Sequence, residues 1–165
     1  MSNFISKVLL LFLQILIMNK KERAELFSIL FIPFLFLLIM WLVKIIEHTF
    51  HFSFIQFGVY PQSLNGLKGI LFSPFIHKDF THLVNNSYPI IILGGMLFSF
   101  YKKIAPQLFL WLFFISGFWL WIIGRPSFHI GASGIIYALA SFLFVSGIIR
   151  KNPRLSAVSM VIIFL

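Results

Sequence analysis

Long apolar runs separated by short basic segments dominate the chain from residue 26 onward. The runs cover residues 26–46, 80–101, 106–123 and 132–149. A helix needs about 20 apolar residues to cross a bilayer, so the pattern predicts four membrane-spanning helices. A further apolar run begins at Ala157 and reaches Leu165 after nine residues. At about 1.5 Å per residue, nine residues cannot cross, and we expect the sequence to be cut within a fifth span.

Two other segments do not have the pattern of a span. Residues 4–18 are apolar but short, and they are followed by NKKER rather than by a small-residue cleavage site. They predict an interfacial helix or a removable leader, so we treat 1–25 as a segment separate from a membrane domain at 26–165. Residues 47–79 form a long loop broken by Gly and Pro, and its phenylalanines favour a position in the membrane interface.

The composition also indicates an integral membrane protein. Of the 165 residues, 60% are hydrophobic and 10% are charged, with a mean hydropathy of +1.01, which excludes an ordinary soluble domain. The net charge of +9 comes from basic residues between the apolar runs, where they set topology and contact lipid headgroups. No basic face with interleaved aromatic residues stands apart from the spans, so no nucleic-acid partner is expected. Without cysteine, disulfides, cysteine–zinc sites and thiol catalysis are excluded.

The basic residues also predict an orientation. Three basic clusters precede the first span, separate the second from the third and follow the fourth: Lys20, Lys21 and Arg23; Lys102 and Lys103; Arg150, Lys151 and Arg154. Alternating crossing puts all three on one side, which predicts a cytoplasmic N-terminus in an inner or plasma membrane. Four basic residues fall on the outer side, so the bias is strong but not pure: Lys44, Lys68, Lys78 and Arg125.

Three polar residues stand near the outer starts of two spans. His82 and Asn86 are four residues apart, which places them one turn apart on the same helix face. Ser133 begins the fourth span, and both spans run inward, so all three residues are expected at the same depth. Small residues that allow close helix packing accompany them, at Gly94 in the second span and at Gly134 and Ala138 in the fourth. Packing of the second span on the fourth would bring the three polar groups together.

These residues alone leave a simpler alternative open. Ser133 could bond to its own helix, and His82 and Asn86 could be polar contacts between helices. Their matched depth favours a site, but it does not define a reaction.

Two motifs carry a resemblance to a known family. The segment GASG at Gly131–Gly134, continuing into IIYAL, resembles the Gly-x-Ser-Gly motif of rhomboid intramembrane proteases. HLVNN at His82–Asn86 resembles their His-x-x-x-Asn signature, and Gly94 falls where that family also has glycine. The loop Gly58–Leu83 is similar to the lead-in of many bacterial members. The resemblance covers about residues 26–165 and implies six spans when complete.

The resemblance also implies roles. Ser133 would be the nucleophile, and its amide together with the His82 and Asn86 side chains would bind the oxyanion. Gly131 and Gly134 would leave room for the substrate backbone, and Tyr137 would pack against the catalytic histidine. In the family that histidine, the general base, lies on the sixth span, and no histidine follows Ser133 here. We therefore expect a GHxxG-like segment beyond Leu165, and an inactive fragment without it.

Other histidines offer weaker alternatives. His129 precedes the fourth helix, where loop polarity explains it, and His48, His51 and His77 are expected to be interfacial residues of the long loop. Acidic partners for a metal are few, being limited to Glu22, Glu25, Glu47 and Asp79. The HExxH and GxGD patterns of other intramembrane proteases are absent, so we expect no metal or cofactor.

Two positions depart from the family pattern. Pro89 lies three residues after Asn86 and is expected to perturb the helix near the site. Gln62 stands where many family members carry arginine, so we expect the anchoring of the 47–79 loop to differ from the family pattern.

The combined prediction is an all-α, polytopic, rhomboid-like membrane bundle. It would be a serine endopeptidase that cleaves transmembrane or membrane-adjacent protein segments through an acyl-enzyme, with membrane lipids as its surroundings. The alternative is a rhomboid-like pseudoprotease that binds transmembrane clients without cutting them. A transporter or channel would need mid-depth polar lining and inverted repeats, and neither is seen.

Overall fold

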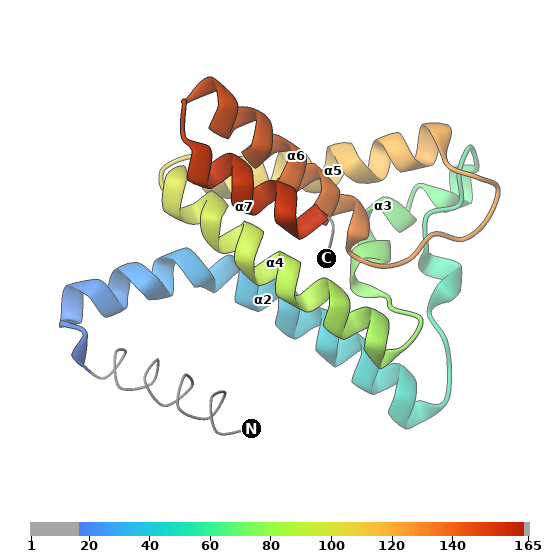
Figure 1. Cartoon of the computed structure of the whole chain (residues 1–165). Helices are drawn as coiled ribbons and strands as arrows, with labels where there is room; N and C mark the ends of the chain where they lie inside the picture. The colour runs from blue at the N-terminus through green and yellow to red at the C-terminus, as the bar shows by residue number, and fades with distance from the viewer. Residues whose placement is uncertain (1–16, 164–165) are drawn as a thin grey trace.

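The structure, a computed structural model, describes residues 17–163, with side chains to residue 160 (Figure 1). Every regular element in this range is a helix, which confirms the predicted all-α class. The long helices are α2 (Lys20–Phe50), α4 (Phe80–Phe100), α5 (Ala105–Ile123) and α6 (Ser133–Ile149), and α7 (Pro153–Ile163) follows. The loop after α2 holds α3 (Gly69–Phe72) and three 3₁₀ turns, η1 (Ile55–Phe57), η2 (Leu64–Gly66) and η3 (Ser73–Phe75).

The lengths of three of the four long helices agree closely with the predicted spans. Within the described residues, α2, α4 and α5 are long and apolar enough to cross a membrane, and α6 is an apolar helix of 17 residues. The bounds of α4, α5 and α6 differ from the predicted runs by no more than one residue at either end. The start of the last helix was predicted less well, because α7 begins at Pro153, four residues before Ala157.

The first helix is longer than the apolar run within it. The Asn19 side chain accepts a hydrogen bond from the Glu22 amide (3.0 Å), and the Glu22 carboxylate accepts one from the Asn19 amide (2.8 Å). This capping box starts α2 at Lys20, in a polar stretch. The predicted boundary between residues 25 and 26 therefore falls inside a helix. Of the segment predicted at 4–18 as an interfacial helix or a removable leader, the part up to residue 16 lies outside the described residues.

A proline and a glycine set the crossing of α2 with α4. Figure 1 shows α2 bending partway along its length, as expected for a helix with Pro33 in its interior. Pro33 is buried against α4, where a Cβ added to Gly94 would lie 2.8 Å from the proline Cγ. Gly94 was expected to help α4 pack on α6, and this expectation is wrong, since its close neighbour belongs to α2.

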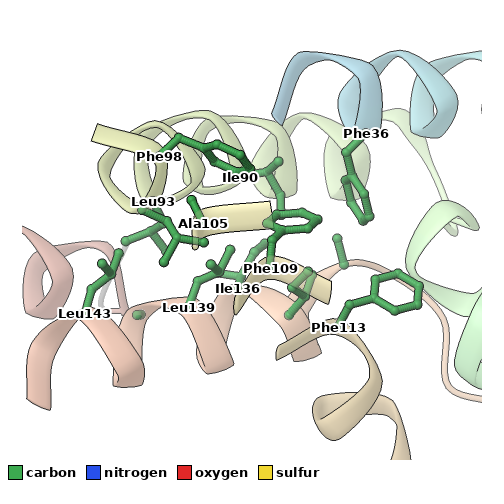
Figure 2. Close-up of a cluster of buried hydrophobic side chains, with 14 of the residues drawn as sticks. Phe36, Ile90, Leu93, Phe98, Ala105, Phe109, Phe113, Ile136, Leu139 and Leu143 are labelled. Atoms are coloured by element: carbon green, nitrogen blue, oxygen red, sulfur yellow. The ribbon is translucent and has the colours of Figure 1, made fainter. Parts of the chain in front are cut away.

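The core is one apolar cluster centred on α4 (Figure 2). Helix α4 packs against α2, α5 and α6, and α6 packs in turn against α5 and α7. Fully buried positions include Leu93 on α4, Ala105 on α5 and Leu139 on α6, each with no exposed surface. This packing fixes where the helices begin and end relative to one another, and it therefore positions the polar residues at the helix starts.

The outer surface of the bundle is also apolar. Large side chains on the outside include Phe34 (59% exposed) and Leu42 on α2, and Trp111 (65% exposed) on α5. A soluble protein rarely exposes such a continuous apolar surface, whereas lipid tails cover it without cost. The helices thus define an integral membrane protein.

The long loop after α2 is hydrogen-bonded to the C-terminal end of α5 and to the segment that follows it. Val59 and His129 form a two-way β-bridge, with N–O distances of 2.9 and 2.8 Å. Gln62 donates its amide N–H to the Trp121 carbonyl (3.0 Å) and its side-chain amide to the Ile122 carbonyl (3.2 Å). The residue that departs from the family pattern therefore does hold the loop to α5.

Candidate functional site

An aspartate fixes the start of the helix that carries His82 and Asn86. Asp79 is the N-cap of α4, and its carboxylate accepts a hydrogen bond from the His82 amide at 2.7 Å. This bond is also the main cause that holds the pKa of Asp79 below its ordinary value. The first turn of α4 is therefore anchored, and the His82 and Asn86 side chains project from the same face one turn apart.

The backbone of the GASG segment lies directly against these two side chains. Gly131 has φ +104°, a conformation that L side chains rarely adopt. A Cβ added to it would lie 2.7 Å from His82 Cε1, 2.9 Å from His82 Nε2 and 3.5 Å from Asn86 Nδ2. The structure thus brings together the two motifs that sequence reasoning placed at the same depth, although they lie on different helices.

The turn at Gly131 is also hydrogen-bonded to the loop that precedes α4. Its amide donates a hydrogen bond to the Ser73 carbonyl in η3, at 2.9 Å. Asn86 is 6% exposed, and its Nδ2 is buried with no hydrogen-bond partner among the described residues. Buried amides usually have a partner, so the donor that the described residues leave unpaired beside this turn marks Asn86 as a candidate site residue.

Ser133 is the first residue of α6 and is exposed. No hydrogen bond from its hydroxyl to another residue is found in the part of the chain that the structure describes. Its position in the first turn leaves its own amide without a helical acceptor, near the positive end of the helix dipole. Tyr137, one turn further on, is 55% exposed on the same side.

A cavity of about 230 Å³ opens beside the nucleophile candidate. It lies between η3, α5 and α6, and it is lined by Ser133, Gly131, Gly134 and Tyr137 together with Ser116 on α5. A Cβ added to Gly134 would make only ordinary contact with Ser116, at 3.8 Å. Gly134 therefore faces α5, and it contributes to the wall of the cavity rather than to close packing on α4.

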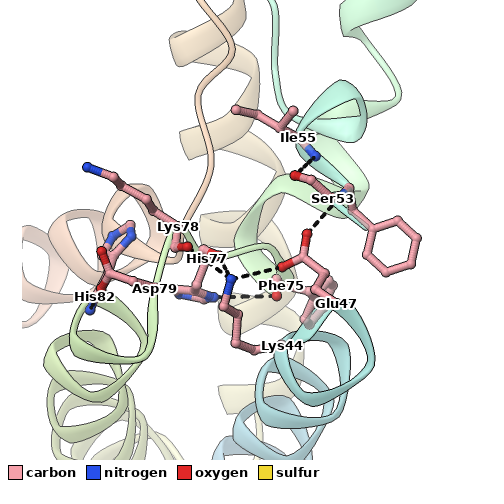
Figure 3. A network of polar contacts seen from close by, with 10 residues as sticks. Lys44, Glu47, Ser53, Ile55, Phe75, His77, Lys78, Asp79 and His82 are labelled. Atoms are coloured by element: carbon pink, nitrogen blue, oxygen red, sulfur yellow. Dashed lines mark hydrogen bonds and ion pairs between the residues drawn. The ribbon is translucent and has the colours of Figure 1, made fainter. Parts of the chain in front are cut away.

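A buried polar network lies next to His82 and was missed by sequence reasoning (Figure 3). The Lys44 ammonium contacts the Glu47 carboxylate (3.3 Å) and donates to the carbonyls of His77 and Lys78 (2.9 Å each). Glu47, 5% exposed, also accepts from the Phe54 amide at 2.6 Å. The only available signal was a lysine and a glutamate three residues apart at the end of an apolar run.

His77 belongs to this network and reaches the site. It is 1% exposed, and its ring packs edge-on against His82 with centroids 5.1 Å apart. Burial, and then the neighbouring His82, lower the pKa of His77 from 6.5 to about 4. It was predicted to be an interfacial histidine, but the structure instead places it, uncharged at neutral pH, behind the His82 ring.

The remaining candidates lie apart from this cluster. His129 sits in the β-bridge, with its Nε2 3.0 Å from the Arg125 carbonyl, as expected for a loop histidine. Among the described residues, no group of three or more His, Cys, Asp or Glu side chains is placed to hold a metal ion. Pro89 lies inside α4, which continues through it to Phe100.

The fold and the paired motifs define a helical membrane protein with a polar cluster at one end of its bundle. A sequence model described as "Rhomboid domain" matches residues 65–165, well over half of the chain. The chain therefore belongs to the rhomboid family, whose members are generally intramembrane serine proteases.

Curated relatives come from mycobacteria. An uncharacterized protein of Mycobacterium tuberculosis is 28% identical over 137 residues, which cover 78% of this chain and 56% of the relative. An uncharacterized protein of Mycobacterium leprae is 31% identical over 125 residues, covering 71% of this chain and 49% of the relative. The chain thus spans about half the length of the curated relatives it matches. No solved structure matches it.

Proposed function

We propose that this chain carries the nucleophile and the oxyanion-binding groups of an intramembrane serine endopeptidase. The observation that supports the proposal most strongly is the contact between Gly131 and the side chains of His82 and Asn86. In a chain of this family, a Gly-x-Ser-Gly turn with two donor side chains beside it supplies two of the three parts that acyl transfer needs, the nucleophile and the oxyanion donors, and the third is a general base.

In this proposal Ser133 Oγ attacks the carbonyl carbon of a substrate peptide and passes its proton to a general base. The carbonyl oxygen becomes an oxyanion, and the His82 ring, the Asn86 Nδ2 and the Ser133 amide donate hydrogen bonds to it. The base passes its proton to the departing amine, which leaves an acyl-enzyme. Water, deprotonated by the same base, then attacks the ester, and the proton returns to Ser133 Oγ as the acid product departs. Each oxyanion donor is worth about 3–4 kcal/mol of transition-state stabilisation.

The general base is the part that these 165 residues do not supply after Ser133. By resemblance to the family, we propose that it is a histidine on a later span, C-terminal to Leu165. Tyr137, exposed one turn from Ser133, would pack against that histidine. The substrate would be a protein segment in or beside the membrane that unwinds to expose its backbone.

We also propose the orientation. The site would open toward the extracytoplasmic face of an inner or plasma membrane, with the N-terminus in the cytoplasm. The distribution of basic residues supports this orientation.

Labelling of the full-length protein by a fluorophosphonate tests the nucleophile. Labelling should be lost in Ser133→Ala and kept in Ser141→Ala, a matched exposed serine two turns along the same helix. Labelling that persists in Ser133→Ala would overturn the assignment. If the wild-type protein is never labelled but retains transmembrane clients on purification, the pseudoprotease alternative is correct.

A second substitution tests the oxyanion groups. His82→Ala should lower turnover by about 10²–10³. The bundle should stay folded, because the cap at Asp79 uses the His82 backbone amide rather than its ring. Unchanged peptide cleavage by this variant would exclude the role proposed for His82.

A further inference from the structure

An apolar groove of about 670 Å³ separates α2 from the loop that follows it. Ile39 and Val43, one turn apart on α2, form one wall, and the loop forms the other with Phe54, Phe57, Leu71, Phe72, Phe75 and Ile76. The groove shares no lining residue with the cavity beside Ser133. It therefore has no part in the proposed chemistry.

A cation lies beside one of the residues that line this groove. The Lys68 ammonium sits 5.0 Å from the centroid of the Phe57 ring, and Phe57 is one of the lining residues. Lys68 is exposed, and within the described residues it makes no ion pair with a carboxylate. Among the basic residues assigned to the outer side, Lys44 is bound within the protein, whereas Lys68 remains available to an external anion.

We propose that the groove holds one acyl chain of an anionic phospholipid, whose phosphate contacts Lys68. The walls are apolar side chains of two elements, and Ile39 and Val43 extend the groove along the axis of α2, in the direction that a lipid tail takes. The Lys68 ammonium supplies charge complementarity to a phosphate, and the loop that carries Lys68 is the segment expected from its phenylalanines to lie in the membrane interface.

The shape of the groove disfavours a protein segment as its occupant. On the α2 side the wall consists of Ile39 and Val43, which lie about one turn or 6 Å apart, too short a contact to hold a second helix. An extended strand would leave its backbone amides and carbonyls against apolar walls, without hydrogen-bond partners. A lipid tail is narrow, carries no polar group and is present at every such surface in the membrane.

Lipid retention tests the proposal. The full-length protein is reconstituted in nanodiscs of phosphatidylglycerol and phosphatidylcholine in equal amounts, released gently, and analysed by native mass spectrometry for bound lipid. Wild-type protein should retain phosphatidylglycerol in preference to phosphatidylcholine. Because one basic residue near a lipid surface changes binding by about fivefold, Lys68→Gln should lower that preference by about fivefold. The matched control Lys78→Gln, an exposed lysine outside the groove, should keep it.

A second variant tests the contact with the acyl chain separately from the contact with the headgroup. Val43→Phe, which fills the groove, should lower retention of both lipids while the helix content stays unchanged. The proposal is overturned if folded Lys68→Gln keeps the wild-type preference, if Val43→Phe retains lipid as well as the wild type, or if crosslinking from Leu71 captures a second copy of the chain. None of these readouts requires catalysis.

Discussion

Replacing Gly131 with alanine should disturb the site through two separate effects. The first is backbone strain, because φ +104° is open to glycine but costs other residues about 1–3 kcal/mol. The second is steric, because the new Cβ would lie 2.7 Å from His82 Cε1. Carbon atoms prefer a separation of about 3.5–4.0 Å, so the imidazole must retreat by roughly 1 Å.

A shift of that size is large on the scale of catalysis. Misplacing a reacting or stabilising group by about 1 Å can cost roughly 10²-fold in rate. If His82 binds the oxyanion, Gly131→Ala in the full-length protein should therefore lose about two orders of magnitude in kcat for a transmembrane substrate. The free energy of unfolding should fall by only about 1–3 kcal/mol.

The assay compares cleavage and unfolding of the same preparations in detergent micelles. Gly95→Ala is the control, since a Cβ there would meet only Leu30 Cδ2 at an ordinary 3.5 Å. A folded Gly131→Ala protein that cleaves at the wild-type rate would show that the turn and the His82 ring are not coupled. The reasoning from the Gly131 contact to the oxyanion site would then be wrong.

Three further outcomes follow from the packing and the polar network. Because the pKa of folded His77 is about 4 and its ordinary value is 6.5, the unfolded chain binds more protons between these values, so stability should fall by up to about 3 kcal/mol as pH drops from 6.5 to 4. Denaturant titrations across this window should show the loss, and His77→Leu should flatten it. Lys44→Met leaves a buried carboxylate unpaired and should cost about 3–5 kcal/mol in the same measurement, whereas Lys78→Met on the exposed neighbour should cost little. Gly94→Ala should lower the melting temperature clearly, because its Cβ would lie only 2.8 Å from Pro33 on α2. Gly95→Ala should hardly change it, because its Cβ would meet Leu30 at an ordinary 3.5 Å. Equal shifts would contradict the assigned crossing of α2 and α4.

Periodicity and hydropathy were sufficient to predict the bundle, because apolar length is a local property of the chain. The ends of α4, α5 and α6 came within one residue for this reason. The start of α2 was missed, because a capping box in a polar stretch does not change the hydropathy pattern. Pro89 was expected to perturb α4, and the structure shows that the helix continues past it to Phe100.

The site was predictable only in part. Matching the depths of His82 and Ser133 anticipated that their motifs meet, since depth follows from topology. A small residue such as Gly94 indicates a close contact but does not name the partner, so its assignment to α6 failed. The network around Lys44 and His77 joins positions about thirty residues apart across an irregular loop, and no local pattern records such contacts.

The β-bridge between Val59 and His129 has a consequence for biosynthesis. Its two halves are separated by the whole of α4 and α5, and one of them leads directly into the Gly131 turn. Chains emerge from the ribosome with the N-terminal part first. The long loop therefore lacks its bridging partner His129 until the connection to α6 has been made, and the nascent protein completes the bridge only after the three long helices α2, α4 and α5 have been synthesised.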